Sequence, residues 1–70
     1  MENKYTINIF WSEEDQGFIA ICSEFPGLSA FGETHAEALS EAQIALKLMI
    51  EHYAESGQAL PEPNRVPVAA

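Results

Sequence analysis

The chain has 70 residues and a net charge of −8, because 11 aspartates and glutamates face only three lysines and arginines. A chain of this length forms a single domain and buries only about 60% of the surface that its unfolded state exposes. The acidic balance argues against direct nucleic-acid binding, which depends on lysine and arginine. Two interpretations of the charge stay open, plain solubility and attraction of a basic protein partner.

The first half of the chain predicts three strands. Residues 5–11 alternate apolar and polar side chains and are rich in β-branched and aromatic residues. The acidic loop that follows predicts a hairpin to a second strand over residues 17–23, whose nearly continuous apolar sequence indicates burial on both faces. Pro26 and Gly27 predict a turn, after which residues 28–32 form a third strand.

The second half predicts one long helix. Thr34 and Glu37 form a capping-box pattern, so we expect a helix over residues 35–56 that Gly57 ends. Its apolar stripe is Leu39, Ala42, Leu46, Met49, Ile50 and Tyr53. In the proline-containing tail, 57–70, residues 65–69 favour either a short edge strand or a frayed end. The expected fold is α+β, an antiparallel three-stranded meander with the helix packed on one face.

A single helix leaves the opposite face of such a sheet uncovered. That face carries Phe10, joined by either Phe18 or the pair Ile19 and Ile21, and by either Phe31 or Leu28, because the register stays open. The helix, at about 33 Å, is also longer than a seven-residue strand of about 23 Å. Its turns around Ile50 and Tyr53 must therefore extend past the sheet or meet another chain. Uncovered apolar patches mark interfaces, so we expect a homo-oligomer, a dimer or a tetramer.

Other ways of stabilising a small domain are not expected. Cys22 is the only cysteine, so no internal disulfide can form, and its apolar neighbours favour a small buried side chain over a reactive thiol. His35 and His52 are too far apart in sequence, and without a second cysteine, to predict a zinc site, so we expect no metal and no cofactor.

The order of the motifs resembles the HicB-like antitoxin family. The family pattern P-(D/E)-L-P-G corresponds here to Ser23-Glu24-Phe25-Pro26-Gly27, with serine in place of the first proline. The pattern G-(D/E)-T-x-x-E-A is matched in full by residues 32–38. After the helix, the pattern I/L-P-x-P is matched by Leu60-Pro61-Glu62-Pro63. The resemblance extends over residues 4–64.

The resemblance implies a truncated ribonuclease H-like fold, ordered β-β-β-α with a possible fourth strand. It also implies a non-catalytic protein that binds and neutralises a small basic mRNA-cleaving toxin of the HicA type. Members of the family commonly carry a C-terminal DNA-binding domain, and this sequence, which ends at Ala70, is expected to have none. The alternative is a stand-alone HicB-like homo-oligomer with another partner or ligand.

We do not expect the protein to be an enzyme. A degenerate hydrolase is the third functional hypothesis, after the antitoxin and the stand-alone homo-oligomer. Two-metal nuclease chemistry needs carboxylates that converge from the first strand, the helix and a later strand. Neither residues 5–11 nor residues 65–70 contain a carboxylate, and no motif supports Cys22 with a histidine as a nucleophilic pair.

The candidate partner-binding residues are acids for charge complementarity and aromatics for apolar anchoring. The acids are Glu13, Glu14, Asp15, Glu24 and Glu33, and the anchor is Phe10 or Phe25. The competing interpretation is a solvated loop for the acids, and a core or self-dimer position for the aromatics. The sequence shows no signal-peptide pattern and no apolar run of about 18 residues, so we expect no membrane contact and a cytoplasmic protein.

Overall fold

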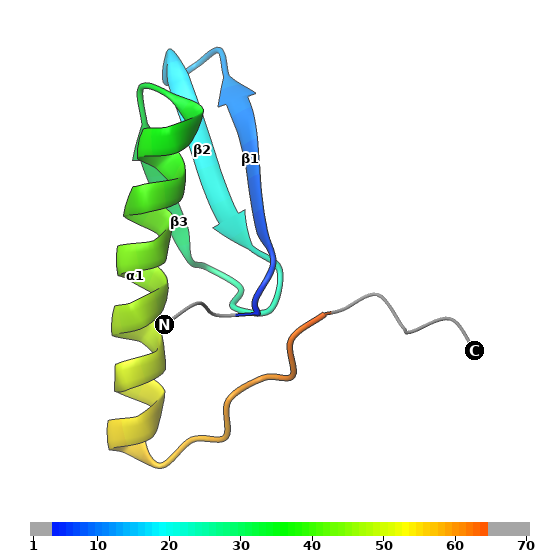
Figure 1. Cartoon of the computed structure of the whole chain (residues 1–70), viewed down its shortest axis with the longest axis vertical. Helices are drawn as coiled ribbons and strands as arrows, with labels where there is room; N and C mark the ends of the chain where they lie inside the picture. Colours follow the sequence, from blue (N-terminus) through cyan, green and yellow to red (C-terminus); the bar gives the residue numbers. More distant parts are fainter. Residues whose placement is uncertain (1–3, 65–70) are drawn as a thin grey trace, which may run out of the picture.

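The computed structural model describes residues 4–64 and shows one antiparallel sheet with one helix packed along one of its faces (Figure 1). The strands are β1 (Ile7–Ser12), β2 (Gly17–Cys22) and β3 (Ser29–Gly32), and the helix is α1 (His35–Ser56). The sheet order is β1-β2-β3 with antiparallel neighbours. The predicted α+β meander followed by one long helix is confirmed. The possible strand over residues 65–69 lies outside the described residues.

The helix begins and ends at the residues that its capping signals predict. The Thr34 hydroxyl accepts a hydrogen bond from the Glu37 amide at 3.0 Å, while the Glu37 carboxylate accepts one from the Glu33 amide at 3.1 Å. Gly57 ends the helix in the left-handed conformation, with φ of 74°. Side chains and a glycine thus satisfy backbone groups that a helix end otherwise leaves unpaired.

The upper half of the core, near the helix start, is built from small residues. Ala20, Ala38 and Ala42 are fully buried between β2 and α1. Leu39, which the predicted stripe placed in the core, is 38% exposed, so that prediction is wrong for this residue. Ala38, one position earlier, is fully buried instead.

The lower half of the core uses larger residues from the β2–β3 connection. Phe25 and Leu28 are buried there together with Cys22 and Leu46. The Phe25 ring packs edge-on against Tyr5, with centroids 4.9 Å apart, and against Tyr53 at 5.3 Å. The last turns of α1 do extend past the strands, as their length predicts, but this connection packs against them within the same chain (Figure 1).

Gly32 is the position where the helix and the sheet approach most closely. A Cβ atom at Gly32 would lie 2.2 Å from the Ala38 nitrogen and 2.7 Å from its Cα, both backbone atoms that cannot rotate away. The glycine is therefore required by packing, since a side chain here would push the first turn of α1 off β3.

Gly32→Ala should destabilise the protein by about 1–3 kcal/mol through overpacking, measured as a lower midpoint in urea denaturation at fixed protein concentration. Gly17→Ala is the control. Its Cβ would meet the ring of Phe31, a surface side chain that can turn away, and would lie 3.0 Å from the Gly32 carbonyl oxygen, a milder backbone contact than at Gly32, so a smaller loss is expected. Equal losses for the two variants would contradict this role of Gly32.

Candidate functional site

The sheet surface that faces away from α1, here called the outer sheet face, is apolar. Phe10, Ile19 and Phe31 lie directly opposite one another across the three strands, and Ile21 lies in the next row. Phe10 is 47% exposed and Phe31 44%, so the described chain leaves these rings uncovered. The register thus assigns Ile19, Ile21 and Phe31 to this face.

Phe18 and Leu28, the other residues that the sequence allowed on this face, point into the core on the helix side. The expectation that the second strand is buried on both faces is wrong for this chain. Ala20 and Cys22 are buried against the helix, but Ile21 remains 38% exposed on the outer sheet face. Within residues 4–64, nothing covers that face.

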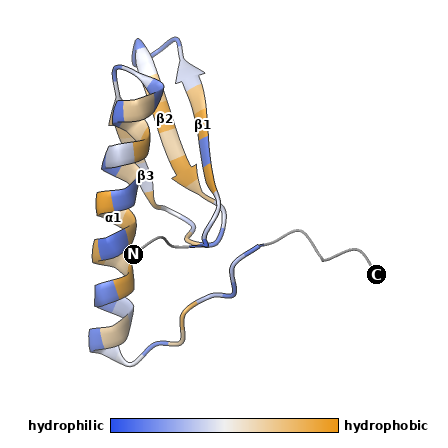
Figure 2. Cartoon of the chain, in the orientation of Figure 1, coloured by the Kyte–Doolittle hydropathy of each residue, from blue (hydrophilic) through white to orange (hydrophobic). Residues whose placement is uncertain are grey.

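The outer sheet face is also electrically neutral. None of the three strands contains a charged residue, although the chain as a whole carries a net charge of −8. Apart from its apolar side chains, the face presents Asn8 and Ser29 in the row of Ile21. Figure 2 shows hydrophobic colour along much of β1 and β2, hydrophilic colour in the β1–β2 loop, and a mixture of both on α1.

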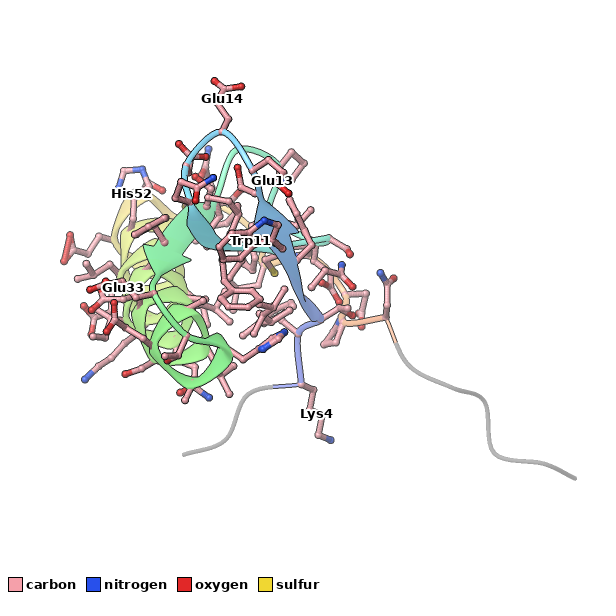
Figure 3. All side chains as sticks on the ribbon, turned by 90° about the horizontal axis from the view of Figure 1, so that it is seen from above. Lys4, Trp11, Glu13, Glu14, Glu33 and His52 are labelled. Carbon is pink, nitrogen blue, oxygen red and sulfur yellow. The ribbon has the colours of Figure 1, made fainter. Side chains whose placement is uncertain are left out.

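The acids of the β1–β2 hairpin project from one end of the molecule. Glu14 points away from the body at the tip of the turn, with Glu13 beside it (Figure 3). The turn is organised from within: Ser12 donates its hydroxyl to the Asp15 carboxylate at 2.9 Å and accepts a bond from the Asp15 amide. The three acids are exposed, as a site for charge complementarity requires, and equally as a solvated loop would be.

The structure does not gather the predicted acids into one patch. Glu33 lies at the hairpin end of the molecule but next to the start of α1, apart from Glu13 and Glu14 (Figure 3). Glu24 lies at the other end, in the connection after β2 (Figure 1).

Glu24 holds three segments of the chain together. Its carboxylate accepts hydrogen bonds from the Thr6 amide at 3.0 Å and the Asn64 amide at 2.7 Å, and a third from the Thr6 hydroxyl at 3.1 Å. Nearby, the Tyr5 hydroxyl donates to the carbonyl of Pro61 at 2.8 Å. These bonds attach the segment after α1 to the lead into β1, which gives Glu24 a structural role within the chain.

The protonation equilibrium of Glu24 reflects these contacts. Burial acts to raise the pKa of the carboxyl, but the hydrogen bonds from Asn64 and Thr6 outweigh it, so the pKa lies below its ordinary value. Burial raises the pKa of the neighbouring Cys22 thiol, which keeps that side chain in its neutral form.

Phe25 is not available as a surface anchor. It is 1% exposed and packed between Tyr5 and Tyr53, so the prediction that Phe25 contacts a partner is wrong. Phe10 remains the exposed member of the predicted pair.

A second uncovered apolar surface lies on α1, and the sequence analysis missed it. Ile44 is 55% exposed and Leu48 61%, on the side of the helix turned away from the sheet. The signal was present: the two residues are one turn apart and fall outside the apolar stripe that faces the core. We call this surface the outer helix face.

Between residues 4 and 64, no three histidine, cysteine, aspartate or glutamate side chains come together as metal ligands would. Across the same residues, no helix has the length and apolar content needed to span a bilayer.

Comparison with known proteins places the chain in a family. No protein-family model matches the sequence. A UPF0150 protein of Synechocystis sp. (strain ATCC 27184 / PCC 6803 / Kazusa) is 40% identical over 55 residues, which is 77% of this chain and 76% of that protein. The chain belongs to the UPF0150 family. The UPF0150 name states no function, so the function of this family member has to be argued from its surfaces.

Replacing Glu24 by glutamine in this UPF0150 protein should cost about 1–2 kcal/mol of stability at neutral pH, because amide hydrogen bonds to a charged acceptor are lost. The folded-state pKa of Glu24 lies below the ordinary value, so its contribution is present above that value and lost as pH falls through the folded pKa.

Urea denaturation from pH 7 down to pH 3 should therefore show wild type losing stability at the acidic end faster than Glu24→Gln. The exposed hairpin residue Glu14 provides a control of equal charge change, Glu14→Gln. Wild type and Glu24→Gln following parallel curves at every pH would refute the structural role of this carboxylate.

Proposed function

We propose that this UPF0150 family member is a non-catalytic binding module of the HicB antitoxin type. It binds a small basic mRNA-cleaving toxin of the HicA type in the cytoplasm and neutralises it. Residues of the motifs that carry the resemblance have structural roles in this fold. Glu24 joins chain segments by hydrogen bonds, Gly32 allows the helix to pack closely on the sheet, and Thr34 caps the helix. They support a shared fold, while the partner is argued from the surface.

The observation that carries the proposal is that the described chain has both uncovered apolar side chains and an excess of acid. Trp11, which is 47% exposed, comes just before the acidic hairpin, and the outer helix face adds Ile44 and Leu48. Exposed apolar groups provide contact energy, and acids select and steer a partner of positive charge.

The distribution of carboxylates supports a non-catalytic role. A two-metal nuclease holds its cations with acids that converge on the sheet, and the strands here carry none. The acids occupy the hairpin turn, the helix surface and the connections. Glu24, which lies in one of those connections, is committed to backbone amides.

The test is direct binding of a purified HicA-type toxin, inactivated at its catalytic residue, followed by calorimetry at increasing salt. We expect a stoichiometric complex whose affinity falls as salt rises, because the attraction between the acidic and basic surfaces is screened. In a parallel assay, the protein should stop RNA cleavage by the active toxin. No complex and undiminished cleavage would refute the proposal.

The hairpin acids should act mainly on the association rate. The double variant Glu13→Gln with Glu14→Gln should lower the rate several-fold at low salt and have little effect at high salt. Glu62→Gln, in the segment after α1, is the matched control. An unchanged association rate in the double variant would show that the hairpin is a solvated loop without a steering role.

A second function, self-association through the outer sheet face, is favoured by the neutrality of that face. Two copies that each carry a net charge of −8 repel one another, and the three strands offer an apolar surface with no charged residue. This face therefore suits a homo-oligomer, with or without a toxin.

Phe10→Thr combined with Ile21→Thr should convert the oligomer to monomer in analytical ultracentrifugation, since both substitutions keep strand propensity while removing apolar contact area. Leu48→Gln, at a more exposed position on α1, should leave the oligomer intact. Wild-type protein that remains monomeric at high concentration and high salt would contradict this second function.

A further inference from the structure

We propose that the outer helix face of α1 is the docking surface for a basic partner, which contacts it through an apolar segment flanked by lysine or arginine. The partner chemistry rests on the function proposed above, whereas the assignment to this surface rests on the residues of α1. The two can be tested separately.

The apolar centre of the surface has no structural task in the described chain. Ile44 and Leu48 belong to neither core cluster, and they lie on the side of α1 opposite to Ala38, Ala42 and Leu46. Two large aliphatic side chains one turn apart, each more than half exposed, are what a docked apolar segment covers.

The residues around this pair form a seam that runs the length of the helix. Spacings of alternately four and three positions place its six members in one line, the arrangement along which a second helix packs. The central two are apolar and the outer four acidic: Glu37, Glu41, Ile44, Leu48, Glu51 and Glu55. Figure 2 shows this mixture of hydrophobic and hydrophilic residues on the side of α1 turned away from the sheet.

The acidic ends of the seam exclude a second copy of this chain as its occupant. An antiparallel pair of such helices would place Glu41 opposite Glu51 and Glu37 opposite Glu55, and a parallel pair would place each glutamate opposite itself. Like charges directly opposite one another destabilise a pairing. The neutral outer sheet face carries no such penalty, so charge assigns the two apolar surfaces to different occupants.

The same seam suits a partner of opposite sign. Four glutamates and one lysine, Lys47, leave α1 with a net charge of −3 when its histidines are neutral. Glu37 is already engaged in the helix cap, whereas Glu41, Glu51 and Glu55 are exposed. An amphipathic helix with apolar residues at its centre and lysine or arginine one turn to either side would complement both the shape and the charge.

The experiment measures binding of the inactivated HicA-type toxin to three variants. Ile44→Ser with Leu48→Ser should weaken binding at least about 30-fold, as loss of a central apolar anchor does. Glu41→Lys with Glu51→Lys keeps the apolar pair but reverses the charge, and should weaken binding most at low salt. Leu39→Ser, which removes an exposed leucine from another side of the same helix, should bind as wild type does.

The outcomes separate the two proposals. Toxin binding by wild type that both double variants retain overturns the assignment to this surface while the proposed function stands. A wild-type protein that does not bind the toxin overturns both. Circular dichroism and the sedimentation coefficient of each variant confirm that the fold and the oligomer are unchanged, as substitutions at exposed positions predict.

Discussion

Close contact between α1 and one face of the sheet is the constraint on which the rest of this structure depends. Ala20 and Ala38 are fully buried between helix and sheet, and a side chain at Gly32 would collide with the backbone of Ala38. Having only one helix, the described chain can cover only one face. In the described chain, this packing leaves two apolar surfaces uncovered, the outer sheet face and the outer helix face.

The two uncovered surfaces differ in charge, and this difference organises the functional account. The outer sheet face is neutral because the acids of a strongly acidic chain lie outside the strands. The outer helix face has an apolar centre between acidic ends. We propose that the first accepts a second copy and the second a basic partner. A small protein could in this way associate with itself and bind a toxin without competition between the two interfaces.

The sequence predicts most of the fold because its local signals are strong. Thr34 and Gly57 mark both ends of α1, and the predicted helix boundaries are confirmed. The first and third strands begin later than predicted, at Ile7 and Ser29, because alternation alone does not mark where pairing starts. Local patterns also left the faces of the strands undetermined, since moving the register by one residue exchanges the two faces.

The candidate site was harder to predict because its residues acquire their roles from distant contacts. Phe25 reads as a surface aromatic in a turn, but Tyr5 and Tyr53, from opposite ends of the chain, enclose it. In the sequence, nothing distinguishes Glu24 from the other acids. Its role comes from the Thr6 and Asn64 amides, which are distant in the chain and donate hydrogen bonds to its carboxylate. Ile44 and Leu48 were not predicted because the apolar stripe that faces the core already accounts for the packing of the helix, and periodicity alone does not mark a second apolar pair on another side. Family membership did not help here, since the UPF0150 name states no function.

The most direct test of the central claim is hydroxyl-radical footprinting of the intact protein, with labelling at Phe10, Phe31, Ile44 and Leu48 quantified by mass spectrometry. The protein alone, compared at low and high concentration, should show protection of Phe10 and Phe31 as copies associate, with Ile44 and Leu48 still labelled. Addition of the inactivated toxin should then protect Ile44 and Leu48. Full labelling of all four residues at high concentration and with toxin present would contradict the account.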